Sequence, residues 1–388
     1  MTGSAGARDL LAARLRRRPG LELVPRERLE ASASLPAPRS GELFGIARWS
    51  DAPAGGSHLE AIDTDLALVL YALDEPGRLP AFVRRALGDA AARQRLGEWV
   101  LDGLLEVHRP ELGAAGSWDT GASALEAFGL GAPPTADDEL ARRSLRLLEL
   151  TVAGDVAEGG RAARHELAER LYRAGREPDG GGLEGCWKGG VDEVCAALGA
   201  TPSRIDFWTV VRPSTRSRGV SAAGAAAGAR PVPKLYVSPA AADLGEALRR
   251  LAPALRRIDF VELKVGATLD AVLRPDKLVL YFEDRRRLEQ AAESLLSALR
   301  RGEPSLRVHG VPFSGALSPD GLLSWAIDPV IEGEPMTSWR AWLAQEIAAA
   351  IVASRRSGSS VEERCGEVLQ RLHGRGVDVA VWAPLEAR

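Results

Sequence analysis

Residues 258–282 read IDFVELKVGATLDAVLRPDKLVLYF. Within them, 258–265 and 277–283 are short runs in which polar residues alternate with apolar ones. Alternation with a period of two residues is typical of β-strands that bury one face. The two runs therefore predict two strands. Runs of the same kind predict three more strands, at 205–211, 233–238 and 377–383.

Helical patterns surround these strands. Apolar residues recur at helical spacing between or after the strands, at 240–256, 284–301, 337–355 and 360–373, and in the first half, at 80–108, 136–152 and 160–175. We expect an α+β protein: a helical N-terminal half, followed by a mixed or antiparallel sheet with flanking helices. The Gly-rich stretch 177–203 predicts the boundary, with a helical domain at 1–200 for docking or structure and an α+β domain at 201–388.

The low-complexity segment 219–233, GVSAAGAAAGARPVP, joins two of the predicted strands. Alanine- and glycine-rich stretches of this kind are typical of flexible loops. The segment could form a lid over a site, and a tolerated Ala/Gly insertion explains it equally well.

Composition narrows the class of protein. The chain has 388 residues, of which 45% are hydrophobic and 27% charged, as in soluble globular proteins. A net charge of −3 argues against nucleic-acid binding. The longest apolar run, Leu66 to Leu73, is too short to span a bilayer. Three cysteines cannot form a disulfide framework and no apolar signal core is visible, so we expect a cytoplasmic protein.

Lysine is scarce in this arginine-rich chain. Of the 50 basic residues only four are lysines: Lys188, Lys234, Lys264 and Lys277. A lysine can give up its proton when its pKa is lowered, whereas an arginine cannot. Three of the four lysines lie between residues 234 and 277, which favours a chemical role over chance survival.

The strand period places several of these groups together. Leu235 and Val237 share one face of their predicted strand, and the other face carries Lys234 and Tyr236. If the apolar faces of three strands pack on one core, the opposite surface carries Lys234, Tyr236, Lys264 and Tyr281. A solvent-exposed face with ordinary polar residues is the alternative.

Arginines cluster in the same region. No acidic residue occurs between Phe207 and Ala242, where Arg212, Arg216, Arg218, Arg230 and Lys234 lie, and Arg274 follows in a later turn. Guanidinium groups bind phosphate oxygens in pairs, so this run suits a phosphate or another dianion. A solvated basic loop would have the same composition.

Three segments resemble a known family. KLYVSP at 234–239, residues 260–282 and GVPFSGALSPDGLLSWAIDP at 310–329 resemble the HopA-type effector family. That family includes type III secretion effectors and proteins of class V lanthipeptide and thioamitide biosynthesis. The resemblance covers roughly residues 200–345.

A more distant likeness is to phosphothreonine lyases. It implies that Lys264 is the general base, that Lys234 and Tyr236 complete the catalytic group, and that Arg274, Tyr281 and a later arginine, Arg340, bind the phosphate. Arg212 joins this phosphate-binding set through the basic run. Two departures are present: Tyr236 stands where those lyases carry histidine, and Glu262 stands where they often carry a further lysine.

The resemblance implies an activity with no cofactor or metal. A phosphorylated Ser or Thr in a ribosomal precursor peptide with a leader would lose phosphate and become dehydroalanine or dehydrobutyrine. A separate kinase-like protein would supply the phosphorylated peptide. The alternative is a non-catalytic effector or scaffold that binds a phosphopeptide or protein on the same basic surface.

Overall fold

The computed structural model describes residues 9–28, 42–50, 57–101, 103–109, 117–120, 124–125, 128, 138–177, 182–213, 232–302, 305–330, 337–355 and 360–385. Two compact units make up the chain. The first comprises residues 1–133 with 369–375, and the second comprises 134–368 with 376–388. The low-complexity segment 219–233 lies almost entirely outside the described residues, as do Arg216, Arg218 and Arg230.

The first unit combines two three-stranded antiparallel sheets with helices. One sheet has the order β1-β5-β6 and the other the order β2-β3-β4. The strands are β1 (Leu15–Arg17), β2 (Glu22–Pro25), β3 (Leu43–Ser50), β4 (Ser57–Asp63), β5 (Leu105–Arg109) and β6 (Ser117–Asp119). The helices are α1 (Thr64–Ala72), α2 (Ala81–Leu87), α3 (Asp89–Leu101) and the short 3₁₀ turns η1 (Leu10–Ala12) and η2 (Arg26–Arg28).

The sequence analysis did not predict these six strands. For β5 the reason is that the helical pattern at 80–108 continues through it. Gly103 has a φ of 76°, a left-handed conformation that ends a helix. Helix α3 therefore stops at Leu101 and the chain resumes as β5. The apolar residues of β5 happen to continue the helical spacing, which is why the sequence alone does not separate the two elements.

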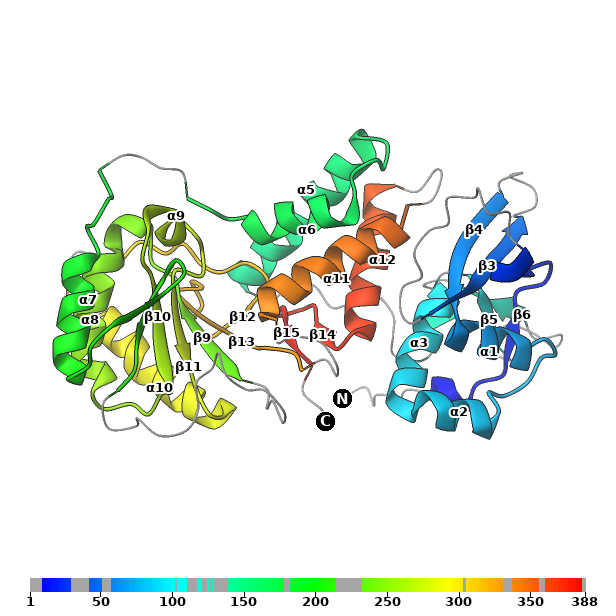
Figure 1. Ribbon diagram of the computed structural model, residues 1–388, viewed down its shortest axis with the longest axis horizontal. Coiled ribbons are helices and arrows are strands. Elements are labelled where there is room, and N and C mark those ends of the chain that lie inside the picture. The colour runs from blue at the N-terminus through cyan, green and yellow to red at the C-terminus, as the bar shows by residue number, and fades with distance from the viewer. Residues whose placement is uncertain are drawn as a thin grey trace, which may run out of the picture. The chain divides into compact units, whose positions relative to one another are not determined.

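The second unit is built on a seven-stranded sheet in the order β12-β13-β9-β11-β10-β8-β7 (Figure 1). Every neighbouring pair is antiparallel, so the predicted α+β class with an antiparallel sheet is confirmed. Its strands are β7 (Ser203–Ile205), β8 (Trp208–Val211), β9 (Pro233–Val237), β10 (Glu262–Gly266), β11 (Leu278–Tyr281), β12 (Gly315–Ala316) and β13 (Leu323–Ile327). The stretch 377–383, predicted as one strand, instead contains β14 (Val377–Asp378) and the first residue of β15 (Ala383–Pro384). These two short strands pair with each other.

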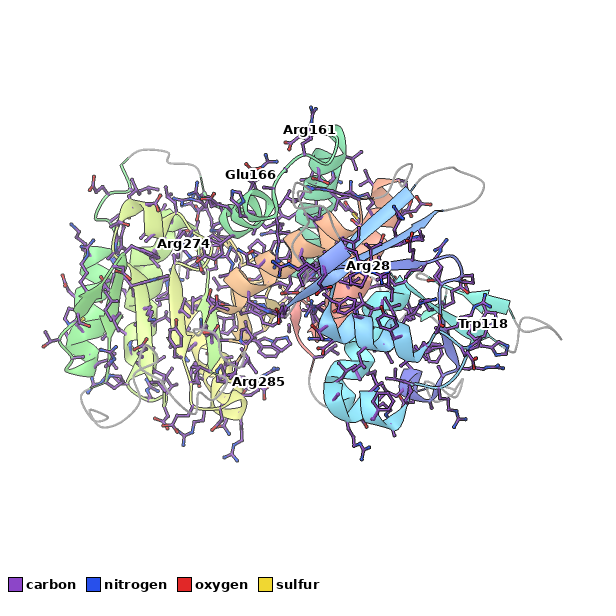
Figure 2. The ribbon with its side chains drawn as sticks, turned by 45° about the vertical axis from the view of Figure 1, so that its right-hand side comes forward. Arg28, Trp118, Arg161, Glu166, Arg274 and Arg285 are labelled. Atoms are coloured by element: carbon purple, nitrogen blue, oxygen red, sulfur yellow. The ribbon has the colours of Figure 1, made fainter. Side chains whose placement is uncertain are left out.

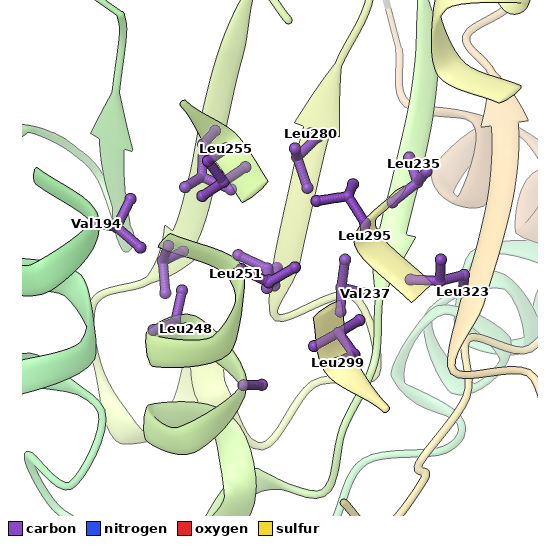
Figure 3. Close-up of a cluster of buried hydrophobic side chains, with 14 of the residues drawn as sticks. Val194, Leu235, Val237, Leu248, Leu251, Leu255, Leu280, Leu295, Leu299 and Leu323 are labelled. Carbon is purple, nitrogen blue, oxygen red and sulfur yellow. The ribbon is translucent and has the colours of Figure 1, made fainter. Parts of the chain in front are cut away.

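One face of this sheet carries the hydrophobic core (Figure 3). Leu235, Leu263 and Leu280 project into it from three adjacent strands and are fully buried. Helices α7 (Lys188–Leu198), α8 (Leu244–Leu255) and α10 (Arg285–Leu299) cover this face. Burying so much aliphatic surface is the main stabilising contribution to this unit.

Further described helices follow in this part of the chain. These are α5 (Glu139–Ala157), α6 (Arg164–Arg173), α9 (Leu269–Val272), α11 (Trp339–Ala353), the 3₁₀ turn η5 (Ala241–Asp243) and α12 (Val361–Gly374), whose residues from 369 on are counted with the first unit. The Asp155 carboxylate, fully buried on α5, accepts hydrogen bonds from Arg355 and Arg364. Helices α5, α6 and α7 thus belong to the sheet-containing unit, whereas the sequence placed them in a separate domain ending at residue 200. The reason is that Trp187, Val191 and Val194 complete the core of the sheet.

Helices α7 and α8 approach closely at two glycines. A Cβ on Gly190 would lie 2.6 Å from the Gly245 carbonyl oxygen, and a Cβ on Gly245 would lie 2.6 Å from the Cys186 carbonyl oxygen. Only hydrogen atoms fit in these spaces, so the glycines allow the helix pair to cover the core.

We predict that Gly190→Ala destabilises the protein by roughly 1–3 kcal/mol, because the added methyl group forces the two helices apart. Gly189→Ala is the matched control, since a Cβ at that position meets nothing within 4 Å. The free energy of unfolding from urea titrations measures both. Equal stability of the two variants would contradict the close approach.

Candidate active site on the sheet

The face of the sheet opposite the core carries the titratable groups. Lys234 on β9 pairs with Tyr281 on β11, which pairs with Glu262 on β10. In the next row, Tyr236 pairs with Val279, which pairs with Lys264. Residues that pair directly across antiparallel strands project to the same face. Lys234, Tyr236, Lys264 and Tyr281 therefore share one surface, as the strand period predicted.

The Tyr281 ring lies between two lysines. The Nζ atom of Lys264 is 4.7 Å from the ring centroid, and that of Lys234 is 5.1 Å from it. The two lysines differ in access to solvent. Lys234 is buried and its Nζ lies 2.5 Å from Asp328 Oδ2, whereas the Lys264 side chain keeps 18% of its surface exposed. Burial lowers the pKa of Lys234, against the opposing effect of the Asp328 carboxylate.

Glu262 is a fully buried carboxylate shared by two cations. Its Oε1 lies 3.3 Å from Lys264 Nζ, and its Oε2 accepts hydrogen bonds from Arg212 at 2.9 and 3.1 Å. Arg212 directly follows β8, the neighbour of β10, so the sheet itself brings these three side chains together. Glu262 thereby anchors two of the candidate residues on adjacent strands.

Asp276 organises a second group of cations at one end of the sheet. Its carboxylate accepts hydrogen bonds from Arg274 at 2.9 Å and lies 2.9 Å from Arg340 Nη1. Burial raises the pKa of Asp276, but the two guanidinium groups outweigh this and hold the pKa well below its usual range. The Tyr172 hydroxyl of α6 accepts a hydrogen bond from Arg274 Nη2 at 2.6 Å, and its ring lies under both arginines. Arg274 and Arg285 lie at opposite ends of β11 (Figure 2), so only the first joins this group.

Tyr236 lies between the two groups. Its side chain is buried, and burial raises its pKa well above 10, with Asp328 and Asp276 acting in the same direction. It therefore stays protonated at neutral pH.

The charges of this surface do not cancel. Five cationic side chains share three carboxylates: Lys234 with Asp328, Lys264 and Arg212 with Glu262, and Arg274 and Arg340 with Asp276. The excess of two positive charges matches a phosphate monoester, which carries about 1.5 to 2 negative charges at neutral pH. The buried Nε–H of Arg340 has no hydrogen-bond partner among the described residues. A bound anion would satisfy it.

All seven sequence-predicted site residues lie in this region, but three of their partners were missed. Asp328 and Asp276 are carboxylates whose role depends on contacts distant in sequence, and Tyr172 comes from a helix assigned to another domain. The acidic residues do lie within the segments that carried the family resemblance. No local signal identifies Tyr172.

Lys277 has a different environment from the other two lysines of the sheet. It is fully buried, and its Nζ contacts Glu177 Oε1 at 2.5 Å, the Pro239 carbonyl at 2.9 Å and His309 Nδ1 at 2.9 Å. Glu177 also accepts a hydrogen bond from the backbone of Ala241. This cluster ties the segment after α6 to the end of the sheet, so the persistence of Lys277 has a structural explanation.

The Lys277 cluster makes stability depend on pH. Partial burial raises the pKa of Glu177, but hydrogen bonds with His309 and Lys277 outweigh this and lower it from 4.5 to about 2. A carboxylate whose folded pKa lies below its unfolded value stabilises the fold above the unfolded pKa and loses that contribution as the pH falls.

We predict that Glu177→Gln lowers the free energy of unfolding at pH 7 by roughly 3 kcal/mol. The loss of stability that the unchanged protein shows between pH 5 and pH 2 should be smaller in the variant. Urea titrations across this range measure it, with Glu293→Gln, an exposed site on α10, as the control. Parallel pH profiles for all three proteins would contradict the assignment.

Comparison with known proteins gives matches among solved structures only. No protein-family model and no curated protein matches the chain. The chain is similar to the effector protein from Pseudomonas syringae pv. tomato strain DC3000, with 14% identity and a TM-score of 0.43 over 63% of this chain and 98% of that one. It is also similar to the phosphothreonine lyase SpvC, an effector protein from Salmonella, with 15% identity and a TM-score of 0.28 over 46% of this chain and 89% of that one.

Two further observations concern the described residues as a whole. None of the described helices is long and apolar enough to cross a lipid bilayer. Within the same residues, no group of three or more His, Cys, Asp or Glu side chains is placed to hold a metal ion.

Proposed function

We propose that this protein is a lyase that eliminates phosphate from phosphoserine or phosphothreonine in a peptide. The Cα–H bond of the phosphorylated residue breaks and its proton goes to a base. The electron pair forms a Cα=Cβ double bond, the Cβ–O bond breaks, and the phosphate leaves with that oxygen. The products are inorganic phosphate and a peptide that contains dehydroalanine or dehydrobutyrine.

The observation that carries the proposal is the surface around Tyr281. It combines a partly exposed lysine, Lys264, with four further cationic side chains that lie on the sheet face and at its end and share three carboxylates with it. Elimination needs both features, because a base must be held against a weakly acidic C–H bond beside a bound dianion. A surface that only bound phosphate would need the charge excess alone.

Lys264 is the proposed base. Its side chain is the accessible one of the pair beside Tyr281, whereas Lys234 is closed off by Asp328. A lysine acts as a base through its neutral amine. Lys234, buried and held 2.5 Å from Asp328, supplies fixed positive charge to the developing enolate or to the phosphate.

Tyr236 and the arginines act on the phosphate. The raised pKa of Tyr236 makes it a hydrogen-bond donor to the bridging oxygen. Arg274, Arg340 and Arg212 bind the non-bridging oxygens, with Tyr281 beside them. Charge-assisted hydrogen bonds of this kind are about twice as strong as neutral ones.

The substrate class follows from the sequence resemblance. The three segments that resemble HopA-type proteins of peptide biosynthesis support a ribosomal precursor peptide with a leader as the substrate. A separate kinase-like protein would phosphorylate it in the cytoplasm. Phosphorylated and unphosphorylated forms of such a precursor, incubated with the protein, test this directly by mass spectrometry for the loss of phosphoric acid.

We predict that Lys264→Ala abolishes elimination while phosphopeptide binding remains. Lys264→Arg should fail as well, because arginine keeps the charge but cannot give up its proton to become a base. Lys188→Ala, at an exposed lysine on α7, is the matched control and should keep full activity. Full turnover by the arginine variant would refute the assignment of the base.

A second prediction concerns phosphate binding. Arg212→Gln and Arg274→Gln should each weaken the binding of a phosphopeptide by about ten- to hundredfold, since a hydrogen bond to a charged group contributes roughly 1.5–3 kcal/mol. Calorimetric titration of the inactive Lys264→Ala background measures the affinity. Arg286→Gln, at an exposed position of α10, controls for net charge. Unchanged affinity in both variants would place the phosphate elsewhere.

A non-catalytic phosphopeptide-binding protein is the second candidate. The ion pair between Lys264 and Glu262 favours it, because the pair engages the amine of the proposed base with a carboxylate of the protein. The two functions differ in one result. A binding protein would hold the phosphopeptide without releasing phosphate at any pH, whereas a lyase would release phosphate at a rate that rises as its base loses its proton.

A further inference from the structure

An exposed apolar cluster adjoins the proposed site. It consists of Ile205, Phe207 and Trp208 in the hairpin formed by β7 and β8, and we call it the apolar rim. Ile205 and Trp208 pair directly across the two strands, and the Phe207 and Trp208 ring centroids are 5.3 Å apart. Ile205 keeps 38% and Phe207 39% of its surface exposed. Single exposed apolar residues are ordinary, but a contiguous group marks an interaction surface.

The apolar rim lies on the same sheet face as Lys264. Lys264 pairs with Val210 and Gly266 pairs with Trp208, so alternate residues of β8 share the face of the base. Ile205, as the partner of Trp208, shares it too. Two strand spacings and two residue steps separate Ile205 from Lys264, which amounts to roughly 12 Å.

The backbone holds the apolar rim in place. Asp206, with a φ of 53°, opens the two-residue turn between β7 and β8. The carbonyl oxygen of Phe207 accepts a hydrogen bond from the backbone N–H of Ala267 at 2.8 Å, which fixes the turn to the end of β10. The exposed Phe207 ring and the half-buried Trp208 ring therefore belong to a fixed surface.

The apolar rim is continuous with the proposed phosphate site. The guanidinium carbon of Arg274 is 5.1 Å from the centroid of the Phe207 ring and 5.7 Å from that of Trp208. A peptide whose phosphate reaches Arg274 would run past these rings toward Ile205. An extended chain advances about 3.3 Å per residue, so 12 Å corresponds to three or four residues.

We propose that the apolar rim is a specificity site for the peptide substrate. It binds an apolar side chain three or four positions from the phosphorylated residue, in a peptide that lies across β8 and β7. This inference rests on the proposed function and adds to it a sequence requirement for the substrate. An aromatic pair and an isoleucine at the edge of the sheet favour a leucine, isoleucine, valine or phenylalanine side chain over a polar one.

The test uses a set of phosphothreonine peptides. Each has the same polar sequence with one leucine placed at one to six positions on either side of the phosphothreonine. Binding is measured by fluorescence anisotropy on the Lys264→Ala variant, which leaves the peptide intact. Leucine three or four positions away, on one side, should bind about tenfold more tightly than the polar peptide.

Two variants and a control locate the effect. Ile205→Ser and Phe207→Ser should each remove most of the gain given by leucine. Ile205→Ser, which does not contact Arg274, should leave the affinity of the polar phosphopeptide unchanged. Leu150→Ser, at an exposed leucine of α5, should keep the gain. The peptide series measured on Lys264→Ala alone tests the proposal even if one of the serine variants fails to fold.

The outcomes separate this inference from the proposed function. Phosphopeptides that bind equally well wherever the leucine lies would overturn the specificity site and leave the lyase proposal intact. A leucine gain that survives both serine variants would also overturn it. Binding that does not depend on the phosphate, together with no release of phosphate by the unchanged protein, would overturn both.

Discussion

The buried carboxylate of Asp276 is the interaction on which the site depends. It binds Arg274 from the loop before its own strand and Arg340 from α11, and Arg274 in turn contacts Tyr172 of α6. Elements as far apart in sequence as α6 and α11 are thus joined through this carboxylate and its two arginines. Removing one partner of a buried ion pair typically costs about 3–5 kcal/mol, because the other charge is left uncompensated. Asp276 therefore couples the phosphate-binding arginines to the stability of the fold.

Period-two alternation predicted much of the sheet. Leu235, Leu263 and Leu280 face the core and Lys234, Tyr236 and Lys264 face the other way, because a strand has only two sides and the apolar side must be buried. Features set by distant contacts were not predictable. From sequence, helix α7 belongs to an N-terminal helical domain, whereas in the structure Trp187 and Val194 complete the core of the sheet. Strand β5 was missed because the left-handed Gly103, which separates it from α3, carries no signal in the apolar spacing.

The candidate site shows the same division. The sequence predicted that Lys234 and Lys264 share a surface, since their positions follow from strand geometry. It did not predict that Asp328 would pair with Lys234, or that Glu262 would pair with both Lys264 and Arg212. The position of a carboxylate in the sequence does not indicate which cation it will contact. Lys277 illustrates the limit. Because lysine is scarce in this chain, the sequence favoured a chemical role for Lys277 as much as for Lys264. Its contacts with Glu177 and His309 show that Lys277 has a structural role.

The pairing of cations with carboxylates bears on which ligand the surface selects. A chain with a net charge of −3 repels anions at long range, so binding depends on the local excess of two positive charges. With five unpaired cations the surface would repel itself and bind any anion. The three buried carboxylates hold the cations in place before the ligand arrives and limit the excess of positive charge, as recognition of a phosphorylated residue requires.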